Sequence, residues 1–159
     1  ELPDAVYTSH ARLIQTLKRV KPPRDPVVPK QMMQTDPART TAQKLGINQA
    51  MRVGVIDAPA DYERVIGPLP EGSELEENPR AACTLTLWFV HDPDEYRSGL
   101  RRMRRWLEKG RAWVIYPKGK QSALTQYVVR ELALAMGMVD YKVCAVDATW
   151  TGMLFTIKK

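Results

Sequence analysis

Short apolar runs alternate with amphipathic stretches through most of the chain, which predicts strands that alternate with helices. Continuous apolar or β-branched runs, typical of strands covered on both faces of a parallel sheet, occur at 51–57, 83–90 and 111–117. Helical patterns, each stopping at a glycine, follow them at 61–66, 93–109 and 122–136. The last two runs are joined so closely that they must pair antiparallel, and they cover 140–147 and 151–159.

This order predicts a small Rossmann-like α/β domain over residues 40–159. Its sheet is mainly parallel, with helices on both faces and a C-terminal antiparallel hairpin. A short helix near 4–20 and a basic arm precede the domain, within residues 1–39. Five prolines in the arm exclude helix and central strand there. The arm is therefore a mobile tether or, through residues 20–39, a contact to a protein partner or a second copy.

Composition narrows the class of protein. With 159 residues, 44% of them hydrophobic and 26% charged, the chain matches a globular domain. It lacks the run of about 18 apolar residues that would cross a bilayer, so no membrane role is expected. The two cysteines, Cys83 and Cys144, sit in apolar stretches and predict reduced thiols, hence the cytoplasm or another reducing compartment such as an organelle matrix.

Four motifs in the compact part resemble a bacterial family, domain of unknown function 3052. They are AQKLGI, GPLPEG, WVIYPKGK and the closing GMVDYKVCAVDATWTGMLF, which is the most specific. The resemblance spans residues 41–159 and implies a compact Rossmann-like sheet similar to part of a methyltransferase. It implies no particular reaction.

Ligands of an open parallel sheet bind beyond the carboxyl ends of its strands, which selects candidate residues. An anion site is predicted where two ammonium groups meet a helix start, at Lys118, Gly119, Lys120 and Ser122. The alternative is a solvated loop. Further crevice candidates are Asp57, His91, Asp92, Asp147 and Trp150. Some of these residues also have a structural interpretation. Asp92 could cap a helix, and Asp147 and Trp150 could hold a turn.

The sequence lacks the motifs expected for cofactor binding, nucleotide hydrolysis or zinc binding. The turn after the first strand, from Asp57 to Glu63, contains no glycine, so side chains are expected to fill the space that a nucleoside cofactor would need. The loop PKGKQS lacks the spacing of a nucleotide-hydrolysing loop. Two histidines and two apolar cysteines assemble no zinc ligand set. We therefore predict no cofactor, no metal and no catalytic residue.

Positive charge gathers on the helix expected at 93–109. Lys and Arg outnumber Asp and Glu by 24 to 18, and this helix carries Arg97, Arg101, Arg102, Arg104 and Arg105. Such a set is a solvated surface or a contact to nucleic acid or another phosphate ligand. Three functions remain open: a non-catalytic accessory module, a reduced methyltransferase-like enzyme, and a basic protein associated with nucleic acid or ribonucleoprotein.

Overall fold

The computed structural model describes residues 6–20, 39–119 and 122–158. The chain divides into two units, residues 1–36 and 37–159. The first holds a 3₁₀ turn, His10–Arg12, followed by helix α1, Leu13–Arg19, which is shorter than predicted. The proline-rich arm falls on residues 21–38, outside the described residues. Among the described helices, none has the length and apolar character needed to span a bilayer.

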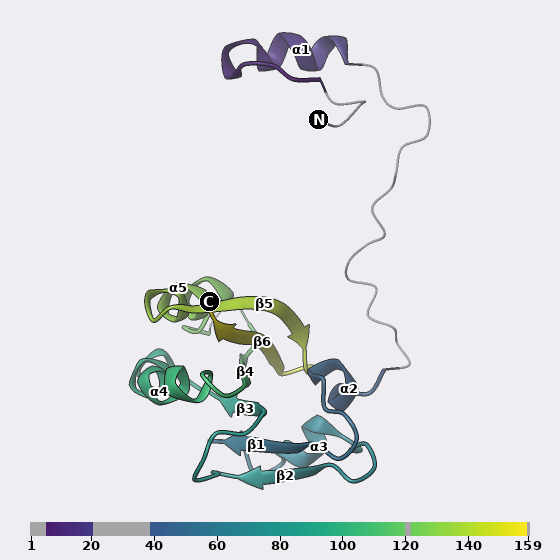
Figure 1. Cartoon of the computed structure of the whole chain (residues 1–159), viewed down its shortest axis with the longest axis vertical. Helices are drawn as coiled ribbons and strands as arrows, with labels where there is room; N and C mark the ends of the chain where they lie inside the picture. The colour runs from purple at the N-terminus through teal and green to yellow at the C-terminus, as the bar shows by residue number, and fades with distance from the viewer. Residues whose placement is uncertain (1–5, 21–38, 120–121, 159) are drawn as a thin grey trace. The chain divides into compact units, whose positions relative to one another are not determined.

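The second unit is built on a six-stranded sheet in the order β2-β1-β3-β4-β6-β5 (Figure 1). Four strands run parallel: β1 Arg52–Ile56, β2 Glu74–Glu77, β3 Leu85–Phe89 and β4 Arg111–Pro117. The closing hairpin consists of β5 Met138–Ala145 and β6 Trp150–Ile157, and β6 pairs antiparallel with both β4 and β5. This confirms the predicted α/β class, the mainly parallel sheet and the C-terminal hairpin.

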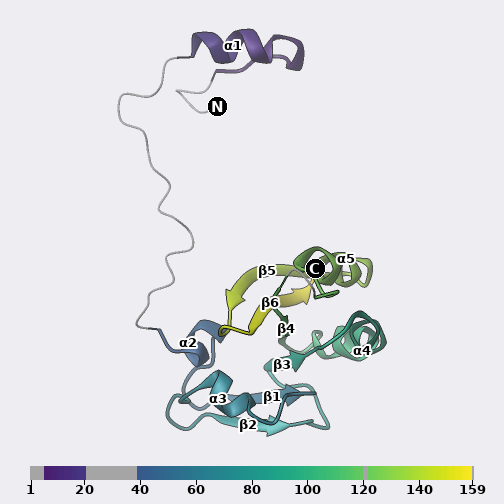
Figure 2. The same cartoon turned by 180° about the vertical axis from the view of Figure 1, so that it is seen from behind.

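Helices cover both faces of this sheet, as Figures 1 and 2 show from opposite sides. On one face, α2 and α3 enclose a core around Trp113; on the other, α4 and α5 cover Trp88 and Phe155. The helices span Thr41–Leu45, Tyr62–Ile66, Pro93–Trp106 and Gln126–Ala135. The prediction for α5 was wrong at its start, because the side chain that caps the helix is Thr125 and not Ser122.

Polar side chains fasten the helices to the sheet. The buried Trp113 indole donates to the Leu45 carbonyl at 2.7 Å and so holds the end of α2. Arg130 of α5 makes a bidentate salt bridge to Asp140 of β5. Its Nε donates to Oδ1 at 2.9 Å and its Nη2 to Oδ2 at 2.7 Å. This guanidinium lowers the pKa of the Asp140 carboxyl. The stability that the bond contributes is therefore kept at neutral pH and lost as pH falls through the lowered pKa.

The connection from β2 back to β3 is unusually short. Parallel crossovers normally take a dozen or more residues, whereas here residues 78–84 alone pass from one side of β1 to the other. They lie directly on Gly54, where a Cβ would come within 2.9 Å of the Pro79 Cγ and 3.2 Å of the Cys83 Sγ. Gly54 thus provides the space for this segment, which occupies the place of a covering helix.

We expect Gly54→Ala to destabilise the protein by about 1–3 kcal/mol, because the added methyl overpacks the Pro79 contact. Urea unfolding measures the change. In the Gly54→Ala/Pro79→Ala double variant the clash is relieved, so the two effects should not add. An unchanged urea midpoint for Gly54→Ala would contradict this packing.

Candidate functional site

The connections of the sheet diverge at one point, between β1 and β3. The chain leaves β1 through α3, on one face, and leaves β3 through α4, on the other. In open α/β sheets such a switch point forms a crevice outside the carboxyl ends of the strands. Three residues with polar side chains are found at these strand ends. Asp57 comes directly after β1, Glu77 is the last residue of β2, and His91 comes two residues after β3.

The turn after β1 begins with Asp57 in the left-handed conformation, at φ 52°. Aspartate tolerates this region better than most residues, so it provides the backbone course for which glycine is commonly used. Its Oδ2 accepts from the Trp88 indole at 3.3 Å and pairs with Arg102 Nη2 at 3.4 Å. The Asp57 side chain is therefore engaged toward α4.

A hollow of about 240 Å³ lies beside this turn on the α3 side. It is lined by Val55, Ala58, Pro59, Ala60, Tyr62, Glu77 and Asn78. The Tyr62 hydroxyl is hydrogen-bonded to the carboxylate of Glu77. Burial and then this bond raise the pKa of Tyr62 to about 12, so the hydroxyl keeps its proton at neutral pH. The hollow is thus bordered by small side chains and one fixed carboxylate.

A second hollow, of about 230 Å³, lies on the α4 side of the same turn. Its lining residues are Asp57, Trp88, Glu95, Ser98, Gly99 and Arg102. Both carboxylates there already have partners, since Asp57 pairs with Arg102 and Glu95 accepts from the backbone N–H of His91 at 2.7 Å. The Glu95 carboxylate therefore holds the start of α4, and Asp57 contacts its third turn.

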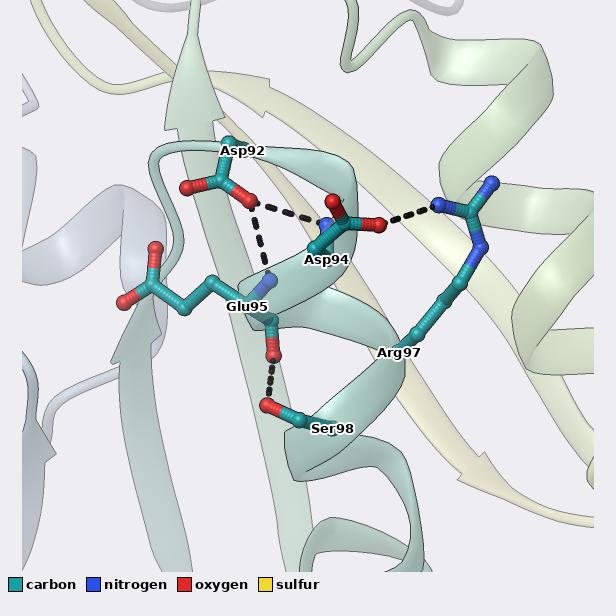
Figure 3. A network of polar contacts seen from close by, with 5 residues as sticks. All are labelled: Asp92, Asp94, Glu95, Arg97 and Ser98. Atoms are coloured by element: carbon teal, nitrogen blue, oxygen red, sulfur yellow. Dashed lines mark hydrogen bonds and ion pairs between the residues drawn. The ribbon is translucent and has the colours of Figure 1, made fainter.

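Asp92 serves as a helix cap, the structural role considered for it. Its Oδ1 accepts from the backbone N–H of Asp94 at 2.8 Å and of Glu95 at 2.9 Å (Figure 3). Within the same turns, Arg97 pairs with Asp94 at 2.9 Å and the Ser98 hydroxyl donates to the Glu95 carbonyl. All the acceptor contacts of Asp92 thus serve the helix start.

The remaining crevice candidates gather around the β5–β6 turn. Asp147 Oδ1 accepts from the backbone N–H of Thr149 at 2.7 Å and of Trp150 at 2.6 Å, so it holds the turn. The His91 ring meets the Trp150 ring edge-on, with 5.4 Å between centroids. The structure therefore brings His91, Asp147 and Trp150 to one rim. The Asp57 side chain instead contacts Trp88 and Arg102, and Asp92 caps α4.

The predicted anion site has a different geometry from the one expected. Lys118 Nζ donates to the Asp147 carbonyl, and the Ser122 hydroxyl donates to the Leu124 carbonyl at 3.3 Å. Because α5 starts at Gln126, Ser122 lies outside the helix N-terminus. Gly119 has a positive φ of 127°, a conformation that favours glycine. Lys120 lies outside the described residues. Anion binding by this loop stays a prediction.

Two residues at the rim, Tyr62 and Glu77, were not singled out from the sequence. The usable signal was spacing: Glu77 follows Asp57 by twenty positions, the distance at which nucleoside-binding folds place an acidic residue for the ribose. The missing glycine hid this signal. Among residues 6–20, 39–119 and 122–158, no group of three His, Cys, Asp or Glu side chains could hold a metal.

Comparison with solved structures identifies the fold. The chain is similar to a ribosomal protein L11 methylase from Lactobacillus delbrueckii subsp. bulgaricus, at 8% identity over 75% of each chain and a TM-score of 0.50. It is also similar to a TehB-like SAM-dependent methyltransferase from Corynebacterium glutamicum, at 12% identity over 75% of this chain and 88% of that one, with a TM-score of 0.46. The protein has a Rossmann-like α/β fold of the kind found in methyltransferases.

The sequence comparisons give no family. No protein-family model and no curated protein matches the chain. The resemblance to domain of unknown function 3052 therefore continues to rest on the four motifs alone.

The two roles of Asp57, backbone and side chain, can be separated by substitution. We expect Asp57→Ala to be less stable than Asp57→Gly by about 1 kcal/mol, because both lose the Trp88 and Arg102 contacts but only alanine is strained at φ 52°. Guanidinium unfolding measures both variants. Equal stability of the two would show that the turn is unstrained or relaxes freely.

Proposed function

We propose that the protein binds the nucleoside part of an adenosine-bearing ligand such as S-adenosylmethionine, as a methyltransferase-like protein. The observation that supports this most directly is the hollow of about 240 Å³ beside Ala58 and Pro59, with Glu77 fixed at its border. It lies next to the switch point, where this class of sheet binds its ligands.

The residues present fit a nucleoside better than the sequence indicated. Asp57 takes the left-handed conformation itself, so the turn does not need glycine, and Ala58 and Ala60 add only methyl groups to the lining. The volume is below the roughly 300–1,000 Å³ of most small-molecule sites, so the hollow suits one part of such a ligand. The Glu77 carboxylate is placed to accept from ribose hydroxyls while it retains the Tyr62 hydroxyl.

When bound, S-adenosylmethionine supplies an electrophilic methyl group. The residues described here support holding the ligand: Glu77 binds the ribose, Tyr62 orients Glu77, and Pro59 covers one side. The carboxylates of the neighbouring hollow already have partners, Arg102 for Asp57 and the His91 N–H for Glu95. Binding is therefore the part of the function that this rim supports best.

S-Adenosylhomocysteine, S-adenosylmethionine and adenosine should each raise the melting temperature of the full chain, because a ligand that binds only the folded state stabilises it. Glu77→Gln should weaken binding about tenfold or more, the effect of losing one charge-assisted hydrogen bond. The matched control is Glu74→Gln, on the same strand but outside the lining. A flat melting temperature with all three ligands, or equal losses in the two variants, would overturn the proposal.

A second candidate function is a non-catalytic accessory module that contacts a protein partner or a second copy through its N-terminal unit. The observation that favours it is the apolar surface of α1, where Ile14 is 72% and Leu17 64% exposed. Apolar residues exposed together on one short helix are typical of contact surfaces. The contact predicted for residues 20–39 would continue from this helix.

Ile14→Glu/Leu17→Glu should abolish any association seen by chemical cross-linking and light scattering of the full chain, since charged side chains cannot be buried in an apolar contact. The control is Thr16→Glu/Lys18→Glu on the same short helix. Association that survives the first variant would exclude α1 as the contact.

A further inference from the structure

Charge is segregated along the sheet of the larger unit. Residues 51–77, which form β1, α3 and β2, contain seven acidic and two basic residues. Residues 78–159 contain fourteen basic and seven acidic residues. Because β2 and β1 form one end of the strand order, the acidic part lies at one edge and the basic part covers the rest. A polyanion would therefore be attracted to one side of this unit and repelled by the other.

Helix α4 carries a row of cations spaced four residues apart. Arg97, Arg101 and Arg105 lie on the helix and Lys109 in the turn after it, so they follow one another along the same side of the helix, and all four are exposed. Arg97 pairs with Asp94, whereas Arg101, Arg105 and Lys109 have no carboxylate partner among the described residues.

The other arginines of α4 are occupied. Arg102 pairs with Asp57 at 3.4 Å and Arg104 with Glu108 at 3.1 Å. Like charges at a spacing of four destabilise a helix, so the unpaired row is not explained by the stability of α4. A ligand with repeated negative charges would relieve that repulsion. The row is therefore suited to a polyanionic partner.

An exposed aromatic ring stands on the neighbouring helix. Tyr127, in the first turn of α5, is 71% exposed. The start of α5 packs on the start of α4 through the Tyr96 hydroxyl, which donates to the Val129 carbonyl at 3.0 Å, and the two helices lie side by side in Figures 1 and 2. An exposed aromatic side chain on a helix that packs beside a cationic helix provides a stacking surface for an unpaired base, which acidic peptides do not use.

We propose that the outer side of α4, with Arg101, Arg105 and Lys109, binds the phosphate backbone of a single-stranded nucleic acid, and that Tyr127 stacks with one of its bases. This surface is separate from the nucleoside hollow, which lies on the α3 side of the sheet. Each function can therefore fail without the other.

Fluorescence anisotropy with a labelled 20-nucleotide single-stranded RNA and the full chain tests the proposal, with single-stranded DNA of the same sequence in a second arm. With about three phosphates neutralised, the logarithm of the binding constant should fall with the logarithm of salt concentration with a slope of about −2. Arg101→Glu and Arg105→Glu should each weaken binding about fivefold or more. Arg64→Glu is the matched control, because it removes an 85% exposed helical arginine from the acidic edge and changes net charge equally.

Two further measurements distinguish nucleic acid from an acidic protein as the ligand of the α4 surface. Tyr127→Ala should weaken binding of the single strand severalfold and leave polyglutamate competition unchanged. If polyglutamate competes as well as RNA and Tyr127→Ala has no effect, the surface recognises acidic protein and the proposal is wrong. It is also wrong if the α4 variants behave like Arg64→Glu, since the attraction would then come from net charge or from the N-terminal unit. Circular dichroism of each variant confirms folding.

Discussion

The short return path from β2 to β3 is the constraint on which the arrangement of the larger unit depends. Residues 78–84 must cross β1 and also cover one of its faces, and they do so only because Gly54 has no side chain. This crossing places β3 beside β1, and the connections that leave these two neighbours, α3 and α4, lie on opposite faces of the sheet. The crevice at the end of β1 follows from that divergence, so the same contact that closes the core also creates the candidate site.

Much of this fold could be predicted from the sequence, because burial on both faces leaves a direct signal. The runs that became β3 and β4 are apolar at nearly every position, and Asp92 with Pro93 marks the start of α4 unambiguously. Boundaries were less predictable. Ser122 and Thr125 are both good cap residues, but Thr125 accepts from the Val128 N–H whereas Ser122 bonds to Leu124, a difference that the residue types alone do not predict.

The candidate site was harder to predict, for two physical reasons. Glycine is the usual but not the only residue that takes a left-handed turn, so its absence after β1 hid a conformation that Asp57 adopts. The second reason is that carboxylates look alike in a sequence. Asp92 and Asp147 hold backbone turns, Asp57 pairs with Arg102, and only Glu77 borders the hollow, a difference that depends on strand order.

The two proposed surfaces lie on opposite sides of the turn after β1. The nucleoside hollow lies on its α3 side, and on its α4 side Asp57 holds Arg102, the neighbour of Arg101 in the cationic row. The Asp57–Arg102 pair is half-exposed, so it contributes little to the stability of α4. Each surface is therefore built from its own side chains, and Asp57 and Arg102 stand between them without belonging to either ligand contact.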